Sequence, residues 1–449
     1  MPPLAALKDL RSRLGGPLLK PGDPAYDTLR RVWNGMIDRR PAMIAQCRDA
    51  ADVASCIRVA RDHQLPLTVR GGGHNYAGKA VCDDGLMIDL TLMKDIQINE
   101  AARTAQAQTG LKLGEFDRAT QNYGLATPMG VATTTGISGL TLGGGYGWLA
   151  GKYGLACDNV LAVEVVTAAG EILECDAEHN AELFWGLRGA GANFGIATRI
   201  DYRLHPVSTI YGGVLLQPLR PEVMRFYDEF SKSCPDEMTT LGVALWGPDG
   251  KPAFATALCY HGPAEEGARL VEPLRNLTPP LVDLIQPRPY LEMQSLFDAD
   301  FKPGRRYYNK AHNLSAFNDD AIATTTRYAH TMPAHPSSIG FQQLHGAAAR
   351  VPAGDTAFPH RHPHYVIWIS PVADDPVNDD AMIRWARECW QAFAPDVERA
   401  VYVNALDDGA EEGDARVRDA YGVNYDRLRR LKQQVDPHNL FQQNSNIVP

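Results

Sequence analysis

The sequence lacks the features that mark membrane, secreted and nucleic-acid-binding proteins. No apolar run approaches the roughly eighteen residues needed to span a bilayer, and Met1 to Lys8 show no basic segment leading into an apolar core. We therefore expect neither a membrane span nor a secretory signal. Lys and Arg number 44 against 53 Asp and Glu, which gives a net charge of −9 at pH 7. That charge argues against nucleic acid or an anionic membrane as the main partner.

Cysteine is sparse, and no metal-binding pattern stands out. The eight cysteines stand singly, and none belongs to a Cys-x-x-Cys pair. Their density is too low for a disulfide framework, and free thiols in a reducing compartment predict a cytoplasmic protein. Histidine is concentrated at His345, His360, His362 and His364, but no set of Asp, Glu or Cys accompanies it. We expect no metal site, since a His-x-His-x-His strand face is as easily exposed to solvent.

The chain is long, and its amino-acid composition changes near residue 207. At 449 residues it exceeds a single core and predicts two or three domains. Up to about residue 206 the hydrophobic periodicity alternates short strands with helices. Near residue 207 the glycine runs end, and alternating strands indicate an antiparallel sheet flanked by helices. The expected fold class is therefore α+β.

The same periodicity places the individual elements. A short helical lead-in over residues 1–38 is broken between Pro21 and Pro24. Further helices are expected over 51–63, 113–123, 182–188, 221–232 and 263–274, and from Tyr425 onward. Strands are expected over 67–70, 85–90, 93–96, 105–109, 161–168, 171–173, 196–204, 212–216, 241–245 and 253–260.

Glycine clusters carry the strongest functional signal. The strand over 67–70 runs into three glycines and then His74. Such glycines allow φ > 0 and let peptide N–H groups approach an anionic ligand closely. With two more clusters, over 136–147 and 189–195, they indicate a large phosphate-bearing ligand held by several loops, although solvated loops are the alternative. None of the clusters has the G-x-G-x-x-G spacing of a Rossmann site, so we expect a pyrophosphate wrapped by several turns.

The segment Val69–Asn75 resembles the covalent-flavin motif of the vanillyl-alcohol oxidase superfamily, which has a PCMH-type FAD-binding domain. The chain is more closely similar to the berberine-bridge-enzyme-like branch, which includes bacterial sugar, aclacinomycin and 6-hydroxynicotine oxidases. Further segments match this branch in order, namely 136–147, 152–159, 185–195, 424–428, 436–441 and 444–447. The resemblance implies an FAD-binding domain over 39–206, a substrate domain over 207–400, and a C-terminal segment over 401–449 that returns to the FAD domain.

The resemblance also implies how FAD is held. In that family the residue matching His74 is bonded to the 8α carbon of the flavin, which raises the potential of the ring. Arg70 would neutralise charge on the pyrophosphate. The other implied contacts with the cofactor are Gly71, Gly72, Gly73, Asn75, Thr135, Gly136, Ser138, Gly139, Leu142, Gly143, Gly144, Gly145, Gly147, Tyr153, Gly154, Asp158, Asn159, Gly195, Ile196, Asn444 and Asn446.

One expected feature of many relatives is missing. They carry a second flavin bond from the cysteine of a Cys-Pro-x-x-Gly segment, and this chain has Ala132 at that position. Alanine forms no thioether, so we expect a single covalent link through His74. Cys82 and Cys157 are the nearby thiols, and Cys157 is expected to be a packed side chain.

The resemblance implies three candidates for proton transfer. Asp355 matches an acidic residue on the floor of the substrate pocket, where burial raises a carboxyl pKa toward neutrality, but a plain loop acid is the alternative. Tyr421 matches a tyrosine that acts as the base in sugar- and alcohol-oxidising relatives, with Tyr425 as a second candidate. A phenol needs help to lose its proton, and Arg361 or Lys432 would supply it if the fold brings them close. Simple packing is the alternative for both tyrosines.

The activity that the resemblance implies is an FAD-dependent oxidase. It would take a hydride from a C–H next to an alcohol, hemiacetal or amine and pass electrons to molecular oxygen, giving hydrogen peroxide. The alternatives are a dehydrogenase with another electron acceptor and a non-catalytic FAD-binding protein. The expected partners are a small-molecule substrate and oxygen, and the expected assembly is a monomer or a homodimer.

Overall fold

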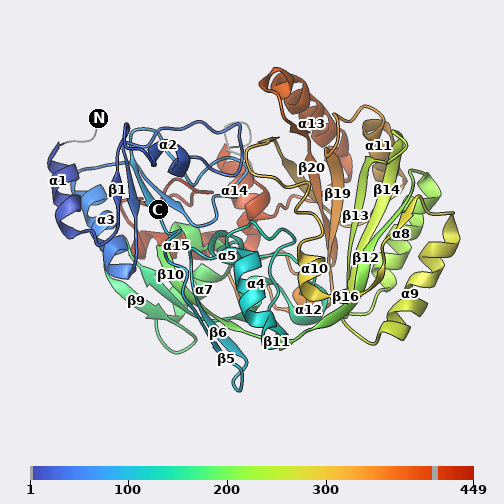
Figure 1. The fold of residues 1–449 in the computed structure, drawn as a ribbon, viewed down its shortest axis with the longest axis horizontal. Coiled ribbons are helices and arrows are strands. Elements are labelled where there is room, and N and C mark those ends of the chain that lie inside the picture. Colours follow the sequence, from blue (N-terminus) through green and yellow to red (C-terminus); the bar gives the residue numbers. More distant parts are fainter. Residues whose placement is uncertain (1–3, 407–412) are drawn as a thin grey trace.

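A computed structural model describes residues 4–406 and 413–449 of the chain. Figure 1 shows two halves, one built from elements near both ends of the sequence and one built around a long sheet covered by helices. Helices and strands are both abundant, which confirms the α+β class. None of the described helices is long and apolar enough to cross a membrane.

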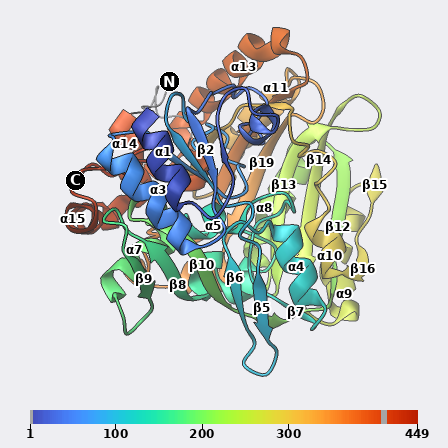
Figure 2. The same ribbon diagram turned by 60° about the vertical axis from the view of Figure 1, so that its left-hand side comes forward.

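The first sheet carries the His74 loop. Its strand order is β1 (Leu18–Leu19), β2 (Met43–Gln46), β4 (Leu86–Asp89) and β3 (Leu67–Arg70). β2, β4 and β3 run parallel, and the glycine loop that carries His74 begins at the carboxyl end of β3. Helix α3 (Ala50–Asp62) begins where the Asp49 carboxylate accepts a hydrogen bond from the Asp52 N–H at 2.9 Å. It packs with α1 (Leu4–Arg13) beside this sheet (Figure 2).

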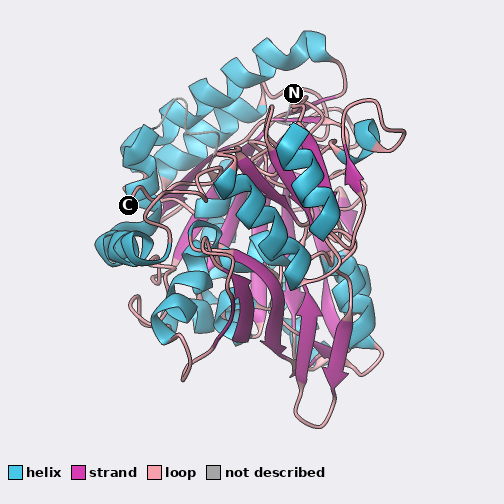
Figure 3. Ribbon diagram, turned by 90° about the vertical axis from the view of Figure 1, so that its left-hand side faces the viewer, coloured by secondary structure: helices cyan, strands magenta, loops and turns pink. Residues whose placement is uncertain are grey.

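The second sheet is antiparallel and lies beside the first. Its order is β5 (Ile96–Asn99), β6 (Thr104–Gln108), β10 (Ile196–Arg203), β8 (Val160–Val166) and β9 (Ile172–Cys175). Helices α4 (Leu113–Gln121) and α7 (Ala181–Ala190) pack on it through a shared core. The β5–β6 hairpin extends away from the rest of the molecule (Figure 3).

The strand expected over 93–96 is wrong, because the strand begins only at Ile96. Met93 lies in a turn, where its N–H donates to Leu90 O at 2.8 Å and its carbonyl accepts from the Gly110 N–H at 2.9 Å. The side chain of Met93 is buried in the core under α3. Its apolar character therefore reflects burial at a turn rather than strand periodicity.

The third sheet forms the other half and is antiparallel, as predicted. Its order is β15 (Val282–Asp283), β12 (Thr209–Pro218), β14 (Pro252–Tyr260), β13 (Met238–Trp246), β19 (Ser338–Leu344), β20 (His364–Ser370) and β18 (Lys310–Leu314), with β16 (Gln286–Pro289) also paired to β12. Its outer face is covered by α8 (Pro221–Ser233), α9 (Ala264–Leu277), α11 (Asp319–Ala329) and α13 (Asp379–Phe393), as Figure 1 shows. The inner face is left to meet the first half.

The chain crosses between the halves twice. It leaves the first half after β11 (His205–Pro206), which pairs with β7 (Leu125–Ala126). It returns to add α14 (Gly413–Tyr421) and α15 (Tyr425–Val435), and α15 packs on α7. The remaining short elements are α2 (Tyr26–Leu29), α5 (Ile137–Leu142), α6 (Ala150–Tyr153), α10 (Tyr290–Gln294), α12 (Gly346–Arg350), β17 (Arg306–Tyr307), β21 (Val372–Ala373) and 3₁₀ turns at Ala156–Asn159, Gly191–Asn193, Pro376–Asn378, Ala394–Asp396, Val403–Ala405 and Gly422–Asn424.

The sequence left open whether the four clustered histidines face solvent, and the structure buries three of them. His345, His360 and His364 are buried, and only His362 is exposed. His360 Nε2 lies 3.0 Å from Ala420 O, and His364 Nδ1 lies 2.7 Å from His362 O. Burial lowers the pKa of His360 to about 4 and that of His364 to about 3. These imidazoles are therefore neutral interior groups at physiological pH.

Candidate active site

A cavity of about 700 Å³ lies between the two halves. One wall is made by the glycine loops of the first half and by the C-terminal tail. The opposite wall is the inner face of the third sheet. The predicted cofactor residues that line this cavity are Gly71, Gly72, Gly73, His74, Asn75, Thr135, Gly136, Ser138, Gly139, Leu142, Gly143, Gly195, Ile196 and Asn444.

Close crossing of two loops explains why glycine is needed on the first wall. A Cβ placed on Gly72 would lie 2.2 Å from the Gly136 nitrogen, and one on Gly136 would lie 2.3 Å from the Gly72 nitrogen. Gly73 adopts a φ of +66°, which disfavours any other residue. The backbone of both loops consequently forms the cavity surface, and its peptide groups can approach a ligand directly.

His74 stands at the edge of this surface with its ring held on two sides. Its Nε2 lies 3.0 Å from Thr134 Oγ1, and the ring stacks on Trp33 with centroids 4.1 Å apart. Trp33 in turn stacks on Tyr307 from the other half of the molecule at 3.7 Å. Burial, with a smaller effect of Lys112, lowers the pKa of His74 to about 3. The imidazole is therefore neutral and keeps a lone pair on one ring nitrogen.

Nine predicted cofactor residues do not line the cavity. They are Arg70, Gly144, Gly145, Gly147, Tyr153, Gly154, Asp158, Asn159 and Asn446. Arg70 is the most consequential, because its guanidinium donates to Leu29 O instead of facing the cavity. Its predicted contact with the pyrophosphate is therefore not supported by the position of the side chain.

Four of the other eight make contacts that hold the loops of the first half in shape. A Cβ on Gly147 would lie 2.0 Å from Met129 O, and the Gly145 N–H donates to the Tyr402 hydroxyl at 3.0 Å. Tyr153 stacks on His205 at 3.9 Å, and the Asn159 amide donates to the carbonyl of Tyr153 at 2.9 Å. These contacts fix the shape of the loops, and the one from Gly145 also holds Tyr402, which lines the cavity.

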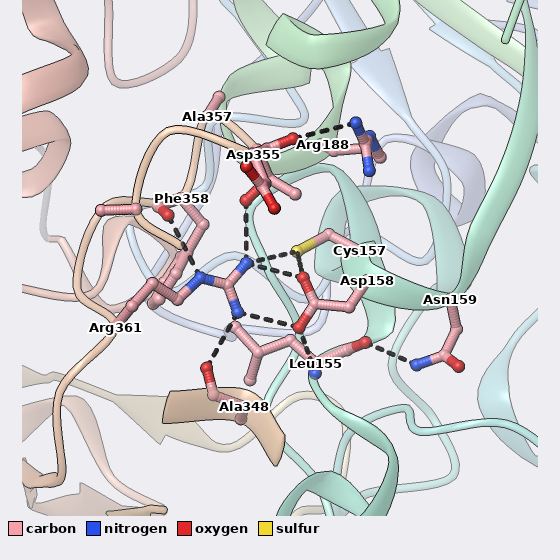
Figure 4. A network of polar contacts seen from close by, with 12 residues as sticks. Leu155, Cys157, Asp158, Asn159, Arg188, Ala348, Asp355, Ala357, Phe358 and Arg361 are labelled. Atoms are coloured by element: carbon pink, nitrogen blue, oxygen red, sulfur yellow. Dashed lines mark hydrogen bonds and ion pairs between the residues drawn. The ribbon is translucent and has the colours of Figure 1, made fainter. Parts of the chain in front are cut away.

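Asp158 belongs to a buried ion pair instead (Figure 4). Its carboxylate accepts from Arg361 Nη1 at 2.8 Å and from Nη2 at 2.6 Å. The same guanidinium donates to Thr356 Oγ1 at 2.8 Å and lies 3.9 Å from Cys157 Sγ. Arg361 is therefore committed to this pair, and Cys157 is a packed thiol whose pKa burial raises.

The three proton-transfer candidates occupy different places. Tyr421 lines the cavity, and its hydroxyl oxygen accepts from Asn193 Nδ2 at 3.2 Å. Burial raises the pKa of Tyr421. Tyr425 is buried beneath Arg418 and does not line the cavity. Asp355 is exposed on a loop where its carbonyl accepts from Arg188 at 3.0 Å (Figure 4), so its position does not support the predicted role.

Lys432, the second cation expected to help Tyr421, is also committed elsewhere. Its ammonium donates to Asp436 Oδ2 at 2.7 Å, to Asn193 O at 2.9 Å and to Phe441 O at 2.9 Å. Lys432 and Asp436 are both fully buried. Lys432 therefore reaches Tyr421 only indirectly, by fixing the backbone of the residue whose amide contacts the phenol.

Several cavity residues escaped the sequence reasoning. They are Tyr76, Lys79, Asn193, Tyr307, Trp368, Tyr402, Asn404, Ser445, and the apolar side chains of β12 to β14. Aromatic residues at isolated positions give no periodic signal, and their meeting depends on contacts between elements far apart in the chain. Only the Asn193 and Ser445 segments carried a clue, because both lie within stretches that matched the resemblance.

The residues of the first wall fit a dinucleotide. Backbone of crossed glycine loops, the ammonium of Lys79 and the buried Asn444 Oδ1, which has no partner within the described chain, all lie on it. Within residues 4–406 and 413–449, no group of three His, Cys, Asp or Glu side chains is placed to hold a metal ion. The first wall thus offers hydrogen-bonding backbone and the neutral imidazole of His74.

Comparison with known proteins agrees with this geometry. A family model described as an FAD binding domain matches residues 41–176, and one described as berberine and berberine like matches residues 401–448. An FAD-linked oxidoreductase of Dictyostelium discoideum is 30% identical, with 97% of this chain and 95% of that protein covered.

Two solved structures are similar over nearly their full lengths. The 6-hydroxy-D-nicotine oxidase of Arthrobacter nicotinovorans has a TM-score of 0.88 at 27% identity, covering 97% of this chain and 98% of that one. The carbohydrate oxidase of Microdochium nivale has a TM-score of 0.88 at 25% identity, covering 99% of each. The protein binds FAD through a PCMH-type domain and belongs to the berberine-bridge-enzyme-like family of FAD-linked oxidoreductases.

Proposed function

We propose that the protein is an oxidase that removes a hydride from a C–H next to an alcohol, hemiacetal or amine, with oxygen as the electron acceptor. The observation that carries the proposal is one continuous cavity that both the His74 loop and Tyr421 line. Bound FAD supplies the hydride acceptor and, on reoxidation by oxygen, yields hydrogen peroxide. The similar solved structures are oxidases of 6-hydroxynicotine and of carbohydrate, which supports this class of reaction.

His74 is the proposed covalent attachment point of the flavin. Its low pKa keeps the imidazole neutral, and a neutral ring nitrogen is the form that can bond to carbon. Thr134 Oγ1 and the stacked Trp33 fix the ring in one orientation. The Ala132 side chain offers no thiol, so the proposal is for a single link.

Tyr421 is the proposed acceptor of the substrate O–H or N–H proton. The Asn193 amide donates to its oxygen, which favours the phenolate, whereas burial opposes it. Asn193 is itself positioned by Lys432 and by the Ile447 N–H, which donates to Asn193 Oδ1 at 2.9 Å. Asp355 and Tyr425 lie outside the cavity and have no part in this mechanism.

The proposal keeps the predicted division into an FAD-binding domain over 39–206, a substrate domain over 207–400 and a returning segment over 401–449. The pairing of β11 with β7 is compatible with a boundary near residue 206. A monomer or homodimer in the cytoplasm is the proposed working form.

Two measurements on separate samples test the proposal. One sample of the purified protein is precipitated with acid to see whether the flavin stays bound, and another, kept native, is assayed for hydrogen peroxide. Wild type should stay yellow in the pellet, whereas His74→Ala should release FAD into the supernatant. Addition of a substrate in air should produce hydrogen peroxide. Turnover with an artificial acceptor but not with oxygen would instead indicate a dehydrogenase, and a flavin that is photoreduced but never reduced by any substrate would indicate a non-catalytic FAD-binding protein.

A further inference from the structure

The third sheet presents an apolar surface to the cavity. Side chains at alternate positions of β12, β14 and β13 line it, including Val214, Ala255, Ala257, Leu241 and Val243. The register places Val214 beside Ala257, and Ala257 beside Leu241, so these side chains form continuous rows. Leu241 and Val243 are only half-buried. An uncovered face of an antiparallel sheet is normally polar, so this surface is built to be covered by something apolar.

The apolar surface also reaches the outside of the molecule. Val282 of β15 and Leu284 line the same cavity beyond β12, and Leu284 is 51% exposed. The surface thus runs from the interior to the edge of the sheet. A ligand with an extended apolar body can lie along it while its other end stays inside.

Polar groups occupy the other end of the same wall, on β19 and β20, and most of them are already paired. Gln342 Oε1 accepts from Trp368 Nε1 at 3.2 Å, and Ser370 Oγ donates to Asn309 Oδ1 at 3.0 Å. At the rim, Asp300 is paired with His335 at 3.3 Å. On this wall of the described chain, the Gln342 NH₂ group and the Ser338 hydroxyl are left to bind a ligand. A sugar ring needs a partner for each of several buried hydroxyls, and this wall does not supply them.

We infer that the substrate is a largely apolar molecule with a single alcohol or amine function, and that sugars are not accommodated. This inference rests on the proposed function and specifies the class of substrate that donates the hydride. The polar function lies toward Gln342 and Trp368, and the apolar body lies over Leu241, Val243 and Ala257. Desolvation of that body supplies the binding energy, and the head group supplies orientation.

Gly340 offers a clean way to test this division. It lies on β19 between Val243 and Trp368 in the register and lines the cavity. A Cβ there would meet nothing closer than the Trp368 Cβ at 3.7 Å. A leucine at this position therefore fits the strand. Its side chain projects into the space between the polar end of the wall, at Gln342 and Trp368, and the apolar side chains of β13 and β14. Gly354 is exposed outside the cavity with nothing within 4 Å of its Cβ position, which makes Gly354→Leu the matched control.

The experiment measures binding to the holoenzyme under nitrogen by equilibrium dialysis, with benzyl alcohol, 4-ethylbenzyl alcohol, 4-butylbenzyl alcohol and cellobiose as probes. The dissociation constant should fall about fourfold for each added methylene, and cellobiose should not bind. Gly340→Leu should abolish the gain from the butyl chain while leaving benzyl alcohol within about twofold. Gly354→Leu should behave as wild type.

Binding that is independent of chain length, or cellobiose bound more tightly than 4-butylbenzyl alcohol, would overturn the inference. The inference would also be overturned if the protein were a dimer and Gly340→Leu dissociated it without changing probe binding. A second copy of the chain, rather than the substrate, would then cover this wall. Failure of the proposed function looks different. In that case the chain-length series is observed, but no probe, nor the corresponding benzylamines, bleaches the flavin.

Discussion

Replacing Lys432 with methionine tests how the C-terminal tail holds the cavity wall. All three ammonium hydrogens of Lys432 are accepted, by Asp436 and by the carbonyls of Asn193 and Phe441. Both charged side chains are 0% exposed. Methionine has similar volume but removes the charge and all three hydrogen bonds. The change leaves the Asp436 carboxylate buried with only the N–H groups of Leu440 and Phe441 as donors.

The expected cost follows from that loss. Breaking a fully buried ion pair by removing one partner costs about 3–5 kcal/mol, which is a large share of the roughly 5–15 kcal/mol that stabilises an ordinary folded domain. Because Phe441 and Asn193 line the cavity, the tail should also loosen there. The urea midpoint of Lys432→Met, followed by far-UV circular dichroism and by flavin fluorescence, should fall by an amount corresponding to this range.

The matched control is Lys232→Met. Lys232 also pairs with an aspartate four residues away, Asp228, at 2.6 Å, but it is 47% exposed. Exposed pairs contribute about 0–1 kcal/mol, so this variant should unfold near the wild-type midpoint. Equal effects of the two substitutions would refute the reasoning, because the difference in burial would then have no energetic consequence.

Three further predictions concern the flavin, the base and pH. Peptide mapping should find flavin on one peptide only, the one containing His74, and a flavin on a cysteine peptide would contradict the single link. Tyr421→Phe should slow anaerobic flavin reduction by roughly a hundredfold or more without changing reoxidation, whereas the exposed Asp355→Asn should leave both steps unchanged; the reverse result would exchange their roles. Stability should fall as pH drops from about 6.5 to 4, because the unfolded chain takes up protons that buried His360 and His364 refuse, at about 1.4 kcal/mol per pH unit for each histidine. His364→Gln should flatten that slope, and an unchanged slope would exclude His364 as its source.

The sequence predicted the strands well where burial and β-propensity agree. The strand Leu67–Arg70 was located to the residue, since an apolar run ends there at three glycines. The segment at Met93 misled the prediction, because one buried side chain at a turn looks like the start of a strand. The histidines from His360 to His364 alternate as they would on one strand face, but the strand begins only at His364. Because the preceding residues form a loop, His362 is exposed while His360 and His364 are buried against Ala420 and Tyr146.

The site was predicted in part, and the division has a physical reason. The glycine loops around His74 were found because close backbone approach restricts the residue type locally. The aromatic stack of His74, Trp33 and Tyr307 was not, since it joins residues from both halves of the molecule. Asp158 was predicted as a cofactor contact, whereas it pairs with Arg361, 203 residues away. A charged residue in a matching motif is expected to have a role, but the motif does not show which residue it pairs with.

Because the chain crosses between the halves twice, the segment that forms the third sheet is an insertion whose two ends both contact the first half. It leaves beside β7 at His205–Pro206 and is fastened on its return where Tyr402 receives the Gly145 N–H. A different sheet of similar length, joined at the same two positions, would bind other substrates while the cofactor-binding loops of the first half stay the same. Chimaeras that exchange this insertion between relatives should therefore transfer substrate preference as a unit while the loop bearing His74 stays as it is.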